Sequence, residues 1–338
     1  MNTPIQSVIQ RFVEQNTNIF DHNHAIVINP ENIFQSITPF FEQVTYVCLR
    51  EDQVNAQCQH LSIIDFLNDP KIDQSELILI LPKAKKLTEI LLHWLSQQNL
   101  EHTNLWVVGE NDLGAKSFDK LAKIYNFESN LVDTARRCRI FELYPASKVD
   151  KPFNLTAHLK SFESEGKKLS TLPSVFSHGH LDKGTQVLIS FLKQNPQNIK
   201  GDILDFACGC GVIAQFCTQY SASITGLDTD YLSIYCANNA NAQNKTSIKY
   251  ITSNGLPKHV IDQYDWIISN PPFHENKRTN YSITETFIQQ SIHHLKPNGK
   301  LLMVVNDFLD YESTVKESFN EIEILYSQKG FKIIKATK

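Results

Sequence analysis

Short apolar runs alternate with amphipathic segments along the first half of the chain. Residues 25–30, 44–49, 77–82 and 105–108 each form a run with the length of a buried β-strand. Apolar positions within residues 87–95 instead recur close to every 3.6 residues, which predicts a helix between the last two strands. Strands that alternate with helices at this spacing predict a parallel sheet with crossover helices. The first half is therefore predicted to be an incomplete α/β domain.

The alternation weakens in a polar, lysine-rich segment between Ala146 and Leu172 and resumes at Asp182. We place a boundary in this segment and expect two domains, residues 1–155 and 165–338. The strands predicted in the second domain are residues 202–206, 223–227, 248–252, 266–269, 300–305, 323–326 and 331–335. Because only a short break separates the last two, they are predicted to form an antiparallel hairpin at the edge of a seven-stranded, mostly parallel sheet.

The two halves repeat one arrangement. Residues 76–82 and 265–271 are both apolar strands that end at a proline, and each is followed by a helix and another strand. We interpret the chain as two tandem Rossmann-like domains of the α/β class, of which the first is a degenerate copy. Two unrelated α/β segments are the alternative interpretation.

Composition narrows the class of protein. Of the 338 residues, 41% are hydrophobic and 20% charged, which argues against intrinsic disorder. A net charge of −4 excludes a uniformly basic surface, so any contact with nucleic acid requires local basic patches. The apolar runs are shorter than the ~20 residues of a membrane span, and no signal peptide is visible. Seven scattered cysteines are typical of reduced thiols, so we expect a cytoplasmic protein that does not act at a membrane.

The segment with the clearest chemistry is a glycine-containing turn in the second domain. A predicted strand ends near Asp205, and Gly209 and Gly211 precede a helix. Glycine allows a positive φ and the close approach of a ligand. About 20 residues further on, the next strand ends at Asp228, where a carboxylate can accept hydrogen bonds from ribose hydroxyls.

The same turn matches the dinucleotide pattern G-x-G-x-x-A, so an NAD(P)-dependent oxidoreductase is one alternative. A carboxylate at Asp205 would repel a pyrophosphate, however, and suits the cationic amino group of S-adenosylmethionine. The pair Cys208 and Cys210 does not have the spacing of a zinc site and has no complementary ligand pair, so no metal is expected.

A second motif, Asn270-Pro271-Pro272-Phe273, follows a later strand. The carboxyl ends of strands are where open α/β sheets bind their ligands. The two prolines fix the backbone so that its carbonyl groups point one way. Asn270 supplies a side-chain carbonyl, and Phe273 supplies an aromatic face.

In their order and spacing, these motifs resemble those of class I S-adenosylmethionine-dependent methyltransferases, and Asn-Pro-Pro-Phe resembles the motif of enzymes that methylate planar nitrogens. Residues 172–177, 181–186, 107–111 and 135–138 extend the resemblance over nearly the whole chain, to the ribosomal RNA small subunit methyltransferase C family. The resemblance implies two tandem methyltransferase domains, of which only the second binds S-adenosyl-L-methionine. It also implies methylation of N2 of one guanine, position 1207 of 16S rRNA, in the small ribosomal subunit.

The resemblance also implies a set of site residues. The catalytic set is Asn270, Pro271, Pro272 and Phe273, and the cofactor-binding set is Asp182, Thr185, Asp205, Ala207, Cys208, Gly209, Gly211, Asp228, Ser253 and Asn254.

Two positions depart from the family pattern. Ala207 replaces the first glycine of the turn and disfavours a positive φ, but the later glycines remain, so we expect cofactor binding to survive. Ser253 and Asn254 stand where an aspartate is common, and Asn can still accept from the adenine amino group.

The expected mechanism addresses a weak nucleophile, because the lone pair of the guanine amino group is delocalised into the ring. The Asn270 side-chain oxygen and the Pro271 carbonyl would accept its two hydrogens and aim the lone pair at the methyl group. Phe273 would stack on a base that has been turned out of its helix.

Short basic clusters are the expected contacts with RNA phosphates. They comprise Lys83, Lys85, Arg136, Arg137, Lys277 and Arg278. A solvated helix face is the alternative interpretation of the first two clusters, around Lys83 and Arg136. Two alternative functions also stay open, an N-methyltransferase for another RNA base and a catalytically inactive RNA-binding or ribosome-assembly factor. The protein is expected to be a monomer.

Overall fold

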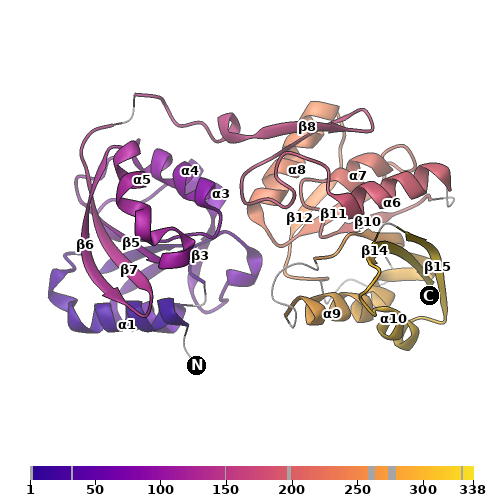
Figure 1. The fold of residues 1–338 in the computed structure, drawn as a ribbon, viewed down its shortest axis with the longest axis horizontal. Coiled ribbons are helices and arrows are strands. Elements are labelled where there is room, and N and C mark those ends of the chain that lie inside the picture. Colours follow the sequence, from indigo (N-terminus) through magenta and orange to yellow (C-terminus); the bar gives the residue numbers. More distant parts are fainter. Residues whose placement is uncertain are drawn as a thin grey trace. The chain divides into compact units, whose positions relative to one another are not determined.

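The computed structural model describes residues 3–31, 33–148, 150–195, 199–257, 263–272, 279–328 and 330–338. Contacts between Cα atoms divide the chain into two units, Met1–Leu159 and Lys160–Lys338. Each unit is built around a sheet of its own (Figure 1). We refer to them as the first and the second unit.

The first unit contains a seven-stranded sheet in the order β3-β2-β1-β4-β5-β7-β6. Its strands are β1 (His24–Ile28), β2 (Gln43–Cys48), β3 (Gln59–Ser62), β4 (Ser75–Ile80), β5 (Thr103–Glu110), β6 (Phe127–Ala135) and β7 (Cys138–Pro145). Its helices are α1 (Pro4–Gln15), α2 (Phe34–Ile37), α3 (Ile63–Asn68), α4 (Lys85–Leu95) and α5 (Phe118–Ile124), with short 3₁₀ turns η1 (Thr17–Ile19), η2 (Thr38–Phe40), η3 (Glu51–Gln53), η4 (Asn111–Leu113), η5 (Ala115–Ser117) and η6 (Leu155–His158). Pairings among β1 to β5 are parallel, whereas β7 pairs antiparallel with β5 and β6.

The second unit contains a seven-stranded sheet in the order β12-β11-β10-β13-β14-β16-β15. Its strands are β10 (Ile203–Phe206), β11 (Ile224–Asp228), β12 (Lys249–Thr252), β13 (Tyr264–Ser269), β14 (Leu295–Asn306), β15 (Glu321–Gln328) and β16 (Phe331–Thr337), and a separate hairpin joins β8 (Lys160–Ser164) to β9 (Lys167–Thr171). Its helices are α6 (Lys183–Gln194), α7 (Val212–Cys217), α8 (Tyr231–Asn244), α9 (Thr279–His294) and α10 (Glu312–Ser318).

The two sheets have the same strand order when their strands are numbered from their own first strand. In both, five parallel strands are followed by an antiparallel hairpin whose last strand inserts next to the parallel part. The prediction of two tandem α/β domains of one fold is therefore confirmed. The predicted hairpin at the edge of the second sheet is confirmed as β15 and β16.

Three strands of the first sheet were absent from the prediction, and the first domain is complete rather than incomplete. β3 and β6 lie at the two edges, and most of their side chains are exposed or half-buried, so neither contains a long apolar run. β7 pairs with β6 through the hairpin. Arg136 and Arg137 form the tight turn of that hairpin at φ 46° and 64°, so the alternative of a helix face is wrong for this cluster.

The core of the second unit explains why its strands were visible in the sequence. One face of the sheet packs on α6 and α7 through Ile203, Ile268 and Leu302, and the other packs on α9 and α10 through Leu204 and Ile267 (Figure 1). A strand that is buried on both faces has no polar alternation and reads as a continuous apolar run. The loops at the carboxyl ends of these strands are thereby held on a rigid base.

In the part of the chain that the structure describes, no helix combines the length and the apolar character that a membrane crossing needs.

Candidate active site

The glycine-containing turn connects β10 to α7 and has left-handed backbone at three positions. Ala207, Gly209 and Gly211 have φ values of 57°, 54° and 84°. Ala207 thus adopts the conformation that glycine prefers, at a cost of roughly 1–2 kcal/mol relative to the right-handed regions. A Cβ at Gly211 would overlap the hydroxyl group of Tyr250 on β12, whereas a Cβ at Gly209 would meet open space. Ala207 therefore takes the left-handed backbone that the turn requires, and Gly211 is needed for close packing as well as for its φ.

Asp205, near the end of β10, is fully buried. Its Oδ2 accepts a hydrogen bond of 2.9 Å from the Ala214 backbone N–H, and no described residue donates to its buried Oδ1. Burial raises the pKa of Asp205 well above its usual range, the Ala214 hydrogen bond opposes this, and the nearby Asp228 adds to it. A cation beside this carboxyl group would lower that pKa. Asp205 is therefore a buried acid that lacks a counter-ion within the described chain.

Asp228 ends β11 and braces the same turn. Its Oδ2 accepts from the Gly209 N–H at 2.8 Å, and its Oδ1 accepts from the Asp230 N–H at 3.0 Å. The Ser253 N–H, just after β12, donates to the Asp228 carbonyl oxygen at 2.9 Å, and Asn254 beside it is exposed. Since β10, β11 and β12 are neighbours, these groups share one carboxyl edge of the sheet.

Cys208 and Cys210 lie in the turn as buried thiols. Burial raises the pKa of Cys208 well above its usual range and raises that of Cys210 to about 12. Both therefore stay protonated at neutral pH. Across the described ranges, no group of three or more His, Cys, Asp or Glu side chains gathers in a way that could hold a metal ion.

Asn270 directly follows β13, the strand next to β10 on its other side. Phe206 and Ser269 are paired in register, and the Ser269 hydroxyl donates to the Phe206 carbonyl at 2.8 Å. The glycine turn and Asn270 therefore start from directly opposed residues. Neighbouring strands lie about 4.8 Å apart, so the two motifs begin at that separation.

The side chain of Asn270 is half-buried and tied to the start of α6. Its Nδ2 donates to Asp182 Oδ2 at 2.8 Å and to Thr185 Oγ1 at 2.9 Å. Asp182 is the N-cap of α6 and also accepts from the Thr185 N–H at 2.9 Å. Asp182 and Thr185 were placed among the cofactor-binding residues, and the contacts seen here are with Asn270. Further along the motif, Pro271 is buried and the Pro272 carbonyl accepts from the Thr284 hydroxyl at 3.3 Å.

Two residues near Asn270 were not singled out from the sequence. A Cβ at Gly184, in the first turn of α6, would lie 3.2 Å from Asn270 Oδ1 and equally close to the Phe331 ring. Phe331 belongs to β16 and reaches this place only through the insertion of that strand beside β14. No local pattern in the sequence could have indicated it. Gly184 lies in the segment 181–186, which carries part of the family resemblance, but the sequence does not indicate which side chains surround it.

The predicted RNA contacts fall into two groups. Phe273, Lys277 and Arg278 lie outside the described residues. Lys83 and Lys85 follow β4, and the turn at Arg136 and Arg137 precedes β7, whose Cys138 pairs with Glu110 at the end of β5. Because β4 and β5 are parallel neighbours, both exposed basic clusters lie at the carboxyl edge of the first sheet.

The corresponding edge of the first unit has neither the glycine-containing turn nor the Asn-Pro-Pro motif of the second. After β1 the chain continues as Asn29-Pro30-Glu31 without glycine, although Asn29 keeps a left-handed φ of 61°. The Asn29 side chain is held inside the unit, donating to the Ile80 carbonyl at 3.2 Å and accepting from Gln53 Nε2 at 2.8 Å. No Asn-Pro-Pro motif follows β4.

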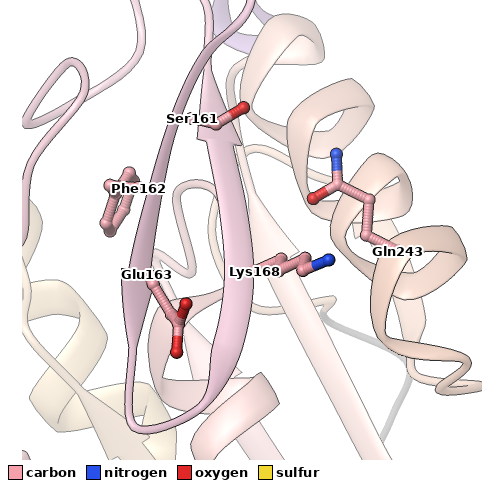
Figure 2. Close-up of a pocket in the computed structure, with 5 residues that line it drawn as sticks. All are labelled: Ser161, Phe162, Glu163, Lys168 and Gln243. Atoms are coloured by element: carbon pink, nitrogen blue, oxygen red, sulfur yellow. The ribbon is translucent and has the colours of Figure 1, made fainter.

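An open hollow of about 570 Å³ lies elsewhere in the second unit, between the β8–β9 hairpin and α8. Figure 2 shows the five residues that line it, which are Ser161, Phe162, Glu163, Lys168 and Gln243. α8 begins beside Asp228 and runs for 14 residues, so its far end at Gln243 is about 20 Å from the carboxyl edge. This hollow is separate from the candidate active site.

Comparisons with known proteins agree with the geometry. Residues 166–335 match the family model "Methyltransferase small domain", and residues 11–162 match "Methyltransferase small domain N-terminal". These matches define the class as methyltransferases with two tandem domains. The ribosomal RNA small subunit methyltransferase C of Psychromonas ingrahamii is 30% identical, with 96% of this chain and 95% of the relative covered. That of Pseudoalteromonas atlantica is 35% identical, with 81% and 80% covered.

The chain belongs to the ribosomal RNA small subunit methyltransferase C family. Among solved structures, the 16S rRNA N2 G1207 methyltransferase of T. thermophilus, in complex with AdoMet and guanosine, has the same fold. Its TM-score is 0.83 at 20% identity, with 100% of this chain and 92% of that chain covered. Membership of a methyltransferase family argues against the oxidoreductase interpretation of the glycine turn.

Proposed function

We propose that the second unit transfers the methyl group of S-adenosyl-L-methionine to the exocyclic N2 of a guanine in 16S rRNA, guanine 1207 by family resemblance. One observation carries the proposal. The glycine turn and Asn270 leave directly paired residues of β10 and β13, so a cofactor site and a base site share one edge. Holding two reactants in line in this way is the main source of rate for a reaction that needs no strong base.

The buried acid and the glycine turn fit the proposed cofactor. Asp205 Oδ1, which has no hydrogen-bond partner among the described residues, belongs to the kind of group whose charge a bound ammonium compensates. The Asp228 carboxylate, which accepts from the Gly209 and Asp230 N–H groups, ends β11 beside this turn, and a carboxylate at that position suits ribose hydroxyls. We propose that Ala207, Cys208, Gly209, Gly211, Ser253 and Asn254 line the rest of this site. When bound, S-adenosyl-L-methionine supplies an electrophilic methyl group on a sulfonium.

Asn270 and Pro271 then act on the substrate nitrogen. The Asn270 Oδ1 and the Pro271 carbonyl accept the two hydrogens of the guanine amino group, which draws the nitrogen toward a tetrahedral shape. Its lone pair is thereby released from the ring and aimed along the line of attack. The product nitrogen loses its proton after transfer, so no catalytic base has to act first. We propose that Pro272 holds this backbone and that Phe273 stacks on the base.

The remaining proposals concern RNA. We propose that the second unit, close to residues 165–338, carries the chemistry and that the first, close to residues 1–155, supports it or contacts RNA. Phosphate contacts are proposed for Lys277 and Arg278, which follow the Asn-Pro-Pro-Phe motif in the sequence, and for Lys83, Lys85, Arg136 and Arg137 of the first unit. Each such contact contributes to an affinity that falls as salt rises.

The proposed function is tested on rRNA from cells that lack the protein. The purified chain is incubated with this rRNA, or with small subunits, and S-adenosyl-L-methionine, and nuclease fragments are examined by mass spectrometry. We expect one fragment to gain one methyl group, on N2 of one guanine. A methyl group on another atom or another base would contradict the assignment, and no methylation of either substrate would favour an inactive RNA-binding factor.

A further inference from the structure

The side-chain amide of Asn270 is held in one orientation by two acceptors. A primary amide nitrogen carries two hydrogens, and here it donates to Asp182 Oδ2 at 2.8 Å and Thr185 Oγ1 at 2.9 Å. With both hydrogens engaged, the other end of the amide, Oδ1, can only accept. Rotation of the amide by half a turn would break both hydrogen bonds and place the carbonyl against the Asp182 carboxylate, which has no hydrogen to donate.

Both acceptors belong to a single rigid element. Asp182 caps α6 by accepting from the Thr185 N–H at 2.9 Å, which fixes the two side chains relative to each other. Thr185 is only 6% exposed. α6 itself packs on the sheet through Leu188 and Leu192, which are fully buried. The orientation of Asn270 is thus set by the first turn of a packed helix.

Gly184 makes this approach possible. A Cβ there would lie 3.1 Å from Asp182 Oδ2 and 3.2 Å from Asn270 Oδ1, tighter than ordinary contact. Within four residues, Asp182 and Thr185 therefore supply the two acceptors for the Asn270 amide, and Gly184 supplies the space for it.

We infer that Asp182 and Thr185 are positioning residues that act through Asn270, keeping its Oδ1, rather than its amino group, directed at the target atom. The inference rests on the proposed function. It explains selectivity for an exocyclic amino group, because a fixed acceptor attracts a donor and repels an acceptor such as a ring nitrogen or a carbonyl oxygen. This role is distinct from the cofactor contact that the sequence predicts for these two side chains.

The test compares three variants in the full chain. Thr185→Val keeps the shape but removes one acceptor, Thr185→Ser keeps the acceptor, and Thr314→Val is a matched control at another buried threonine in a helix of the same unit. We expect Thr185→Val to lower kcat about tenfold with little change in the dissociation constant of S-adenosyl-L-methionine, since the loss is one hydrogen bond. Thr185→Ser should recover most of that loss, and Thr314→Val should not reproduce it.

A double-mutant cycle with Asn270→Ala decides whether Thr185 acts through the amide. Without the amide, Thr185→Val should lower residual turnover no further. An equal loss in both backgrounds, a loss of cofactor affinity in place of turnover, or unchanged turnover would each overturn the inference.

An NMR measurement separates this inference from the proposed function. In protein labelled with ¹⁵N at asparagine, Thr185→Val should shift one of the two Asn270 side-chain N–H signals and speed its exchange with water. Unaltered signals would overturn the inference even in an active enzyme. If the signals change as expected but the wild-type chain methylates no RNA, the proposed function fails and the amide orientation stands.

Discussion

The two glycines of the β10–α7 turn should differ in their tolerance of alanine. Gly209 and Gly211 are both left-handed, so either substitution introduces roughly 1–2 kcal/mol of backbone strain. Only at Gly211 does the new Cβ meet an obstacle, the Tyr250 hydroxyl, and overpacking of this kind adds about 1–3 kcal/mol. The effect of alanine on the unfolded chain is common to both variants and cancels in the comparison. Gly211→Ala should therefore lower the free energy of unfolding by about 1–3 kcal/mol more than Gly209→Ala.

Amide hydrogen exchange measured by mass spectrometry is the appropriate assay, because peptides from β10, β11 and β13 report opening of the second unit separately from the first. The Tyr250→Phe background removes the obstructing oxygen and should recover part of the additional loss. Equal losses for Gly209→Ala and Gly211→Ala, or no recovery with Tyr250→Phe, would refute the packing described for this turn.

Three further predictions follow from the same edge of the sheet. Asp228→Ala should weaken binding of S-adenosyl-L-methionine at least about tenfold in calorimetry, because charge-assisted hydrogen bonds contribute about 1.5–3 kcal/mol each; unchanged affinity would contradict the ribose assignment. Because burial raises the pKa of Asp205, its native state binds the proton more tightly than the unfolded chain, so the stability of the unliganded protein should fall as pH rises through that pKa. The free energy of unfolding, measured by urea titration at several pH values, should fall less with rising pH in Asp205→Asn than in the wild-type chain. The same pH dependence in both proteins would argue against a buried acid. The separately expressed segment 1–155 should show no saturable binding of S-adenosyl-L-methionine, whereas micromolar affinity would contradict a degenerate first copy.

In the first unit, how much of the fold was predictable depended on the burial of each strand. The parallel strands at the centre of both sheets are covered on both faces and were visible as apolar runs. β3 and β6 are edge strands with mostly exposed or half-buried side chains, so their sequences resemble loops. The turn at Arg136 and Arg137 is left-handed without the glycine or asparagine that usually marks one, which hid the β6–β7 hairpin.

For the site, the carboxyl-edge rule predicted which residues would gather. Asp205 and Asp228 lie at the ends of β10 and β11, and Gly209 and Asn270 follow β10 and β13. These three strands are neighbours in the sheet. The hydrogen-bond partners of these side chains could not be predicted by the same rule. The hydrogen bonds from Asn270 to the start of α6 depend on how that helix packs, which no local pattern encodes.

We propose that Asn270 acts on the substrate nitrogen and not on the cofactor. The most direct measurement determines cofactor affinity and single-turnover methyl transfer for Asn270→Ala beside the wild-type chain. We expect nearly normal binding of S-adenosyl-L-methionine and a loss of about a hundredfold or more in methyl transfer, the scale of one lost positioned hydrogen bond in a closed site. Loss of cofactor binding with no separate effect on transfer would contradict this proposal and would make the Asn-Pro-Pro segment a wall of the cofactor site.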